Sequence, residues 1–211
     1  MKLSIASLTL LCLALAVIPA SAQVLYDNGP ANGTTDAWTI NFGYIVSDSF
    51  TIDGDHPVEG FSFGVWEFPG DVVTSVDWSI TSSENIGTVF ASGTAGGGYI
   101  SDKYISTNQY GYNIDAITVV VQLLNLSNGT YWLNLQNASV ASGDPVYWDE
   151  NSGQGCKSNG CPSSASESAL GTIPSEAFTV LIEGTVPEPS SIMLFASGML
   201  GVVGVLRRRV L

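Results

Sequence analysis

One short stretch of this sequence has the spacing of a known catalytic motif. The stretch Gly60-Phe-Ser-Phe-Gly64 formally matches G-x-S-x-G, in which a serine attacks a carbonyl carbon. That chemistry needs a strand, a sharp turn and a helix around the serine, with a histidine later in the chain. Ser62 instead lies in an alternating strand pattern, and the only histidine, His56, precedes it. We therefore exclude a serine hydrolase and assign Ser62 to the polar face of a strand.

Neighbouring carboxylates suggest a second kind of chemistry. Glu67 lies near Asp71, and Asp149 is followed by Glu150. A glycosidase needs two acids that face each other across a cleft, one of them with a raised pKa. Such neighbours arise by chance in a chain with 19 acidic residues. We therefore expect a non-enzymatic protein, with an extracellular carbohydrate-active enzyme that uses a carboxylate pair as the alternative.

Aromatic and acidic side chains gather in the stretch D-P-V-Y-W-D-E-N-S-G at residues 144–153. Aromatic rings can stack on sugar rings, while acids and amides can bind sugar hydroxyls or calcium. The candidate ligand-binding residues are Trp66, Tyr147, Trp148, Asp149 and Glu150. The alternative is that Tyr147 and Trp148 are buried and hold the following loop against the core, which is the commoner role of aromatic residues.

Metal sites have weak sequence support. Asp53 and Asp55 in D-G-D-H-P are similar to the opening of a calcium-binding loop, but the later acidic ligand at EF-hand spacing is absent. We expect no cofactor and no metal ligands, with calcium at clusters of acids as the alternative.

Cys156 and Cys161 are the only cysteines after Cys12, and their close spacing in an exported chain predicts a disulfide.

Period-2 alternation of apolar and polar residues dominates the middle of the chain and predicts strands with one buried face. The alternating segments are 38–44, 61–65, 76–80, 117–123, 131–135 and 178–182, with shorter runs near Val89 and Ile100. Turn residues separate them, and Asn128-Gly129 predicts a β-hairpin. Residues 141–176 predict a long, mostly irregular loop. The pattern predicts an all-β fold, an antiparallel β-sandwich or jelly roll.

The first 22 residues have the pattern of a secretory signal peptide. Lys2 supplies the positive charge, Leu8 to Ile18 form the apolar core, and Ala20-Ser21-Ala22 supply the small residues of a cleavage site. Cys12 lies inside the apolar core, so lipidation there is not expected. We expect signal peptidase to cleave after Ala22 and the exported protein to begin at Gln23.

The C-terminal end also has an apolar segment that could enter a membrane, but its pattern differs from that of a signal peptide. Pro187-Glu188-Pro189 precede an apolar run from Ile192 to Leu206, and Arg207, Arg208 and Arg209 follow it. The apolar run is barely long enough for a transmembrane helix, and the positive-inside rule keeps the arginines in the cytoplasm. A permanent membrane anchor is one interpretation of this pattern.

The order of triplet, apolar run and arginine cluster resembles the PEP-CTERM sorting signal of Gram-negative bacteria that make extracellular polysaccharide. The resemblance implies that exosortase, a membrane-embedded cysteine protease-transpeptidase, recognises the signal and removes the tail. The inner membrane would then hold the protein transiently, before delivery to the cell envelope or extracellular matrix. Globular regions of other PEP-CTERM proteins are often β-sandwiches, so the resemblance implies fold and location but no activity.

The charge distribution supports an extracellular body between the two ends. Of 6 basic residues, Lys2 and the three arginines lie at the ends, and of 19 acidic residues only Glu188 does. The body therefore has 18 acids and 2 bases, which excludes nucleic acid as a partner and leaves extracellular polysaccharide as the candidate. The expected organisation is a signal peptide (1–22), a β-sandwich ectodomain (23–186) and a sorting signal (187–211).

Overall fold

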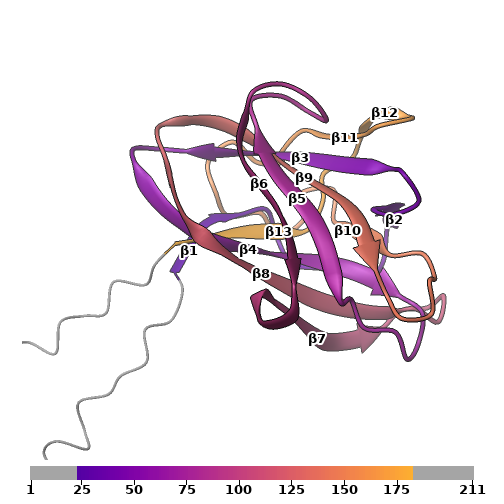
Figure 1. The fold of residues 1–211 in the computed structure, drawn as a ribbon. Coiled ribbons are helices and arrows are strands. Elements are labelled where there is room, and N and C mark those ends of the chain that lie inside the picture. The colour runs from indigo at the N-terminus through magenta and orange to yellow at the C-terminus, as the bar shows by residue number, and fades with distance from the viewer. Residues whose placement is uncertain (1–22, 183–211) are drawn as a thin grey trace, which may run out of the picture. The chain divides into compact units, whose positions relative to one another are not determined.

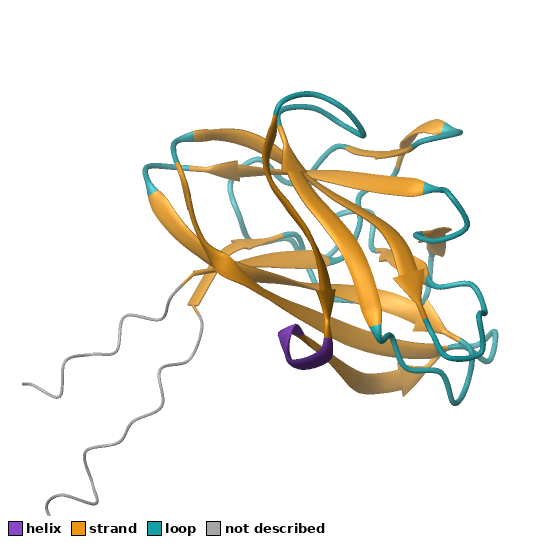
Figure 2. Cartoon of the chain, viewed as in Figure 1, coloured by secondary structure: helices purple, strands orange, loops and turns teal. Residues whose placement is uncertain are grey.

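Residues 23–182, the part of the chain that the computed structural model describes, form antiparallel strands with one short 3₁₀ turn (Figures 1 and 2). The first sheet is built around β4 (His56–Glu67). Along one edge β4 pairs with β13 (Phe178–Ile182) and β10 (Tyr147–Glu150), which pair in turn with β1 (Gln23–Asp27) and β2 (Asp36–Thr39). Along its other edge β4 pairs with β8 (Asn113–Leu126), which pairs with β7 (Ile100–Thr107). The second sheet contains, in spatial order, β12 (Gly171–Ile173), β11 (Ala165–Glu167), β3 (Ile45–Ile52), β9 (Gly129–Ser139), β5 (Ser75–Thr81) and β6 (Val89–Gly96).

The two sheets pack face to face around one apolar core. Phe50 of β3 meets Phe178 of β13 edge-on at 6.4 Å, and Phe61 of β4 meets Trp78 of β5 at 5.6 Å between ring centroids. Alternate residues of a strand point to one face, so the strand pattern of β4 places its apolar residues in this core. The prediction of an all-β fold with antiparallel sheets is confirmed, in a sandwich-like arrangement. The jelly-roll connectivity stays a prediction.

The hairpin predicted at Asn128-Gly129 is wrong. β8 pairs with β4 and β7, whereas β9 pairs with β3 and β5, so the chain crosses from one sheet to the other at this point. A two-residue hairpin of the expected type needs positive φ at both central residues. Neither Asn128 nor Gly129 is among the residues with positive φ. The local preference of Asn128-Gly129 for a tight turn is therefore outweighed by the burial of β8 and β9 in different sheets.

Two other segments differ from the strand prediction. The alternation from Trp38 to Tyr44 predicts one strand, but β2 ends at Thr39 and Phe42 has a φ of 55° in a turn. The segment 141–176, predicted to be mostly irregular, contributes β10, β11 and β12 to the two sheets. Each of these strands has three or four residues, which is too short for a period-2 pattern to identify.

The loop after β10 is held against β1 rather than extended into solvent. The predicted disulfide between Cys156 and Cys161 is confirmed, with the two Cα atoms 6.1 Å apart. The backbone N–H of Lys157 donates to the carbonyl of Asp27 at 3.1 Å, and its ammonium lies 3.0 Å from the Asp27 carboxylate. This loop therefore has a structural role in joining β10 to the edge of the first sheet.

Several predicted features lie outside the described residues. They are the signal peptide, the sorting triplet, the C-terminal apolar run and the arginine cluster. Within residues 23–182, no helix has the length and apolar character needed to cross a membrane. Residues Val24 to Ile182 form one compact unit.

Candidate functional site

Trp148, a candidate sugar-stacking residue, lies in the centre of the core. Its side chain is 0% exposed, and its indole Nε1–H donates to the carbonyl of Ala177 at 3.0 Å. Its ring meets Phe63 and Phe178 edge-on at centroid distances of 5.9 and 5.7 Å. The ring therefore offers no face to a ligand, and its placement agrees with the alternative in which it anchors the following loop.

Asp149 uses its carboxylate to organise the loop between β1 and β2. Its oxygens accept the backbone N–H groups of Asn32 at 2.8 Å and Gly33 at 2.9 Å, and the indole N–H of Trp66. Burial raises the pKa of Asp149, while these three hydrogen bonds oppose the rise. Because Asp149 is fully buried and its oxygens are occupied, it is placed as a structural residue.

Glu150 is also buried and hydrogen-bonded within the protein. Its carboxylate accepts the indole N–H of Trp38 at 3.3 Å and the hydroxyl of Ser152 at 2.7 Å. Adjacent residues of a strand point to opposite faces of the sheet. The carboxylates of Asp149 and Glu150 therefore do not face each other, as the acids of a glycosidase do across a cleft.

Trp66 and Tyr147 belong to a group of aromatic side chains on the outer face of the first sheet. We call this group the aromatic patch, and its members are Trp66, Phe68, Tyr110, Tyr112 and Tyr147. Trp66 stacks on Tyr110 at 5.8 Å with 26° between the ring planes, and Tyr112 meets Tyr147 edge-on at 5.9 Å. Phe68 meets Tyr112 edge-on at 5.0 Å. The patch is thus one continuous set of ring contacts.

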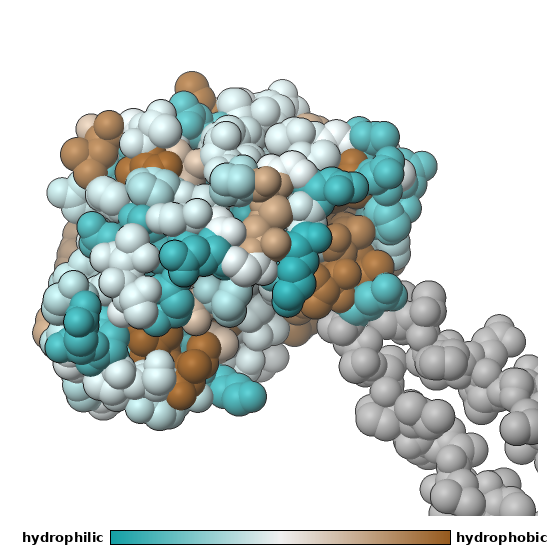
Figure 3. Space-filling model, turned by 180° about the vertical axis from the view of Figure 1, so that it is seen from behind, coloured by the Kyte–Doolittle hydropathy of each residue, from teal (hydrophilic) through white to brown (hydrophobic). Residues whose placement is uncertain are grey.

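The loop after β4 and the loop between β7 and β8 supply the accessible part of the aromatic patch. Tyr110 is 59% exposed and Phe68 is 37% exposed, whereas Trp66 beneath them is 6% exposed. Phe68 and Tyr110, together with Gly111 and Tyr112, line a shallow hollow of about 100 Å³. On the face shown in Figure 3, strongly hydrophobic residues form separate groups between polar ones. The sequence prediction omitted both tyrosines, although Tyr110-Gly-Tyr112 is visible as an aromatic pair in a turn.

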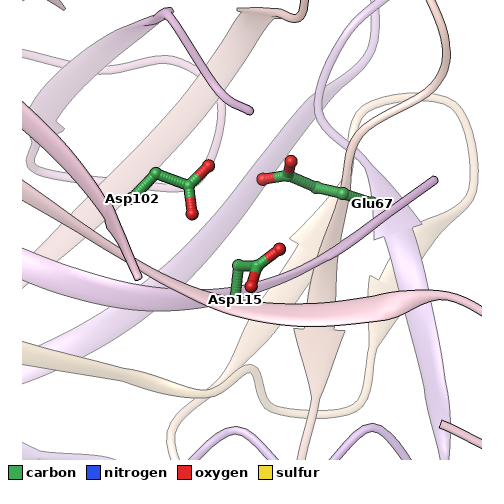
Figure 4. A group of neighbouring side chains, drawn as sticks. All are labelled: Glu67, Asp102 and Asp115. Atoms are coloured by element: carbon green, nitrogen blue, oxygen red, sulfur yellow. The ribbon is translucent and has the colours of Figure 1, made fainter. Parts of the chain in front are cut away.

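A cluster of three acids, which we call the acidic triad, lies on the inner face of the same sheet. Glu67 ends β4, Asp102 belongs to β7 and Asp115 belongs to β8. One carboxylate oxygen from each lies within 4.8 Å of the others, and Figure 4 shows the three side chains pointing toward one another. The register places Asp115 opposite Val65, so the triad continues the inward-facing row of β4.

Glu67 and Asp115 are buried and Asp102 is half-buried, and no basic side chain pairs with the triad among residues 23–182. Glu67 is 0% exposed and Asp115 is 3% exposed. Neither carboxylate oxygen of Glu67 has a hydrogen-bond partner, and Oδ1 of Asp115 has none. Asp102 accepts the backbone N–H of Val73 at 2.8 Å through Oδ2. The ion pair found among residues 23–182 joins Lys157 to Asp27, away from the triad.

The electrostatics of the triad follow from burial and from repulsion between its members. Burial raises the pKa of Glu67 to about 8, and the negative charges of Asp102 and Asp115 add to the rise. Burial also raises the pKa of Asp115 to about 6, with a further contribution from Asp102. Three carboxylates without a cation are an unfavourable arrangement, and their oxygens are the ligands that hard cations prefer. These residues could hold a metal ion.

The other acidic residues named from the sequence are not in this cluster. Asp53 and Asp55 lie exposed in the turn between β3 and β4, where the ring of His56 hydrogen-bonds the Asp53 carbonyl at 2.9 Å. Asp71, paired with Glu67 by sequence, lies in the loop after β4 and has one buried oxygen without a partner. Its negative charge contributes to the raised pKa of Glu67. The structure thus joins Glu67 to two acids that sequence proximity did not suggest.

A second pair of buried acids, Asp48 of β3 and Glu176 before β13, lies elsewhere between the sheets. Asp48 Oδ2 accepts the backbone N–H of Glu176 at 2.7 Å and an amide hydrogen of Asn28 at 3.4 Å. Both oxygens of Glu176 lack partners. Burial raises the pKa of Asp48 to about 8, and burial with the charge of Asp48 raises the pKa of Glu176 well above its usual value.

The comparisons with known proteins bear on the C-terminal end of the chain. A family model described as the PEP-CTERM protein-sorting motif matches residues 185–209. No curated protein matches the chain significantly. Residues 185–209 therefore carry a PEP-CTERM protein-sorting motif, as the resemblance predicted, and this motif implies export and sorting at the membrane toward the cell surface, consistent with an exosortase substrate.

Proposed function

We propose that this chain is a non-enzymatic protein of the cell envelope or extracellular matrix, with a structural or adhesive role. The sorting motif at residues 185–209 is the observation that carries the proposal. Signal peptidase removes residues 1–22, the inner membrane holds the C-terminal segment transiently, and exosortase then removes the tail. The delivered part is the β-rich body.

The surface of the body suits a location among extracellular polysaccharides. Between the two ends, Lys103 and Lys157 are the only lysines and there is no arginine, so acidic groups dominate the surface. Such a surface keeps the protein soluble and repels nucleic acids and anionic lipids. Contacts with a glycan would then depend on aromatic stacking and hydrogen bonds rather than on positive charge.

Glycan binding by the aromatic patch is the finer part of the proposal. Tyr110 and Phe68 present accessible ring surface. Trp66 stacks on Tyr110, and Tyr112, which itself contacts Tyr147, packs against Phe68. Rings held by other rings lose little conformational freedom when a ligand stacks on them, which favours binding. The patch thus replaces Trp148 as the stacking surface and keeps two of the residues named from the sequence.

Replacing Tyr110 and Tyr112 together by alanine is expected to weaken binding to the host exopolysaccharide about tenfold, which corresponds to about 1.4 kcal/mol. Affinity electrophoresis of the exported protein in gels that contain the polysaccharide measures this change. Tyr99→Ala is the matched control, because Tyr99 is 64% exposed outside the patch. Equal retardation of the double variant and the wild type would remove glycan binding by the patch from the proposal.

The same preparation tests the alternative of a carbohydrate-active enzyme. We expect the polysaccharide to be bound without any increase in reducing ends over many hours. Release of reducing sugar that disappears in Asp149→Asn or Glu150→Gln would contradict the non-enzymatic role. A folding control by circular dichroism is needed for both variants, because both carboxylates accept hydrogen bonds inside the protein.

A further inference from the structure

The acidic triad is formed by three strands of one sheet at the end of the core. β4 and β8 pair along their whole length, and β7 pairs with β8, so the register of two ladders sets the positions of the three acids. Asp102 lies beside Lys103, but successive strand residues point to opposite faces, so the ammonium is directed away from the triad. In the described part of the chain, the three carboxylates therefore face one another without a basic side chain between them.

Glu67 supplies an independent reason to expect a ligand. Its side chain is 0% exposed, it points toward Asp102 and Asp115, and both of its carboxylate oxygens lack a hydrogen-bond partner (Figure 4). Buried polar groups in proteins are nearly always paired, and an unpaired buried carboxylate is costly. An acid in this position needs either a proton or a cation.

We propose that Glu67, Asp102 and Asp115 bind a calcium ion. Oxygens on opposite sides of a calcium ion lie about 4.6–5.2 Å apart, because each bond is about 2.3–2.6 Å long. One carboxylate oxygen from each of the three residues lies within 4.8 Å of the others, a spacing that oxygens bound to one calcium ion can have. Both oxygens of Glu67, one of Asp115 and one of Asp102 are free of hydrogen bonds from protein donors. Water completes the six to eight ligands that calcium takes.

Calcium is favoured over magnesium by the kind of site. Magnesium retains several waters and is bound by one or two carboxylates, whereas calcium accepts irregular sets of carboxylate oxygens. Three carboxylates on packed strands therefore suit calcium better than magnesium. Asp71, whose buried oxygen also lacks a partner, lies in the loop after β4 and adds negative charge to the site. The ion would join β4, β7, β8 and this loop at one end of the sheet.

The test is a thermal unfolding measurement on the protein purified from its host. In calcium at about 100 times the Kd, we expect the Tm to be about 5–10 °C higher than in excess EGTA. Glu67→Gln should unfold at the same temperature in calcium and in EGTA. Because buried Glu67 holds a proton when no cation is bound, its neutral amide variant should have about the same Tm in EGTA as the wild type. Isothermal titration should find one calcium ion per chain in the wild type and none in the variant.

Two further variants keep the result interpretable. Asp102→Asn changes the least buried member of the triad and should lose the calcium response even if Glu67→Gln folds poorly. Asp53→Asn with Asp55→Asn changes the exposed turn and should retain the full response. An unchanged wild-type Tm and no binding in the titration would overturn the proposal, since protons would then satisfy the triad. A response retained in Glu67→Gln, or equalled by magnesium, would overturn the assigned ligands or the assigned ion.

Discussion

Trp148→Ala is expected to lower the free energy of unfolding by about 3–5 kcal/mol, the range for aromatic residues removed from a core. The substitution removes the ring between Phe63 and Phe178, where the two sheets meet, and leaves a cavity there. It also removes the donor that pairs with the buried carbonyl of Ala177. Chemical denaturation of the exported protein and its variant measures the difference in the free energy of unfolding.

Tyr99→Ala serves as the control for this measurement, because an exposed ring should change the free energy of unfolding by no more than about 0.5 kcal/mol. The same two variants should be compared for polysaccharide binding. If Trp148→Ala were to weaken binding strongly and leave stability within about 1 kcal/mol of the wild type, Trp148 would be a ligand residue after all. The structural account of residues 148–150 would then be contradicted.

The stability of the protein is expected to fall as the pH rises from about 5 to about 7.5. The carboxyl of Asp48 has a pKa of about 8 in the folded protein, against 3.8 as its ordinary value. Between these two values the folded state binds a proton that the unfolded state has released. The free energy of unfolding therefore decreases with pH, by up to about 1.4 kcal/mol per pH unit for one proton. Above pH 8 this contribution is lost.

Asp48→Asn isolates the contribution of this group. The amide oxygen can still accept the backbone N–H of Glu176, which Asp48 accepts at 2.7 Å. We expect the fall in stability between pH 5 and 7.5 to be less steep in the variant, by up to about 1.4 kcal/mol per pH unit. Glu67, Asp115 and Glu176, whose pKa values are also raised, keep the rest of the dependence. The variant should be more stable than the wild type at pH 8. Asp53→Asn, in an exposed turn, should keep the wild-type dependence at the same calcium concentration. Parallel pH profiles for wild type and Asp48→Asn would contradict the account.

Most of the strands could be predicted because one face of each is apolar. The pattern did not predict β3, a central strand of the second sheet, in which Ser47, Asp48 and Ser49 are buried next to one another. Their side chains bond partners distant in sequence, as Ser47 does with the Asn134 side chain at 2.6 Å. A local pattern of hydrophobicity cannot reveal a polar residue whose partner is brought close only by the fold.

The candidate sites show the same limit. Glu67 was noticed from the sequence with Asp71 as its neighbour, but Asp102 and Asp115 reach it only through the pairing of β7, β8 and β4. The tyrosines of the aromatic patch likewise approach Trp66 from a loop between two strands. Residue type suggested the kinds of chemistry, namely aromatic stacking and carboxylate ligation. The strand register decided which residues come together.

The acidic triad and the aromatic patch lie on opposite faces of the same end of β4. Glu67 is directed inward, and its neighbours Trp66 and Phe68 belong to the patch outside. A calcium ion bound by Glu67 would therefore hold the strand end that supports the patch. The calcium test by unfolding does not depend on glycan binding, so the two proposals can fail separately.

The central claim is that the chain is sorted through its C-terminal motif, and intact mass spectrometry tests it most directly. The protein should be purified from its host and from a strain that lacks exosortase. We predict a host product shortened at both ends, with a longer form that retains the C-terminal tail in the mutant. Persistence of the complete tail in both strains would contradict the claim and identify the C-terminal segment as an ordinary membrane anchor.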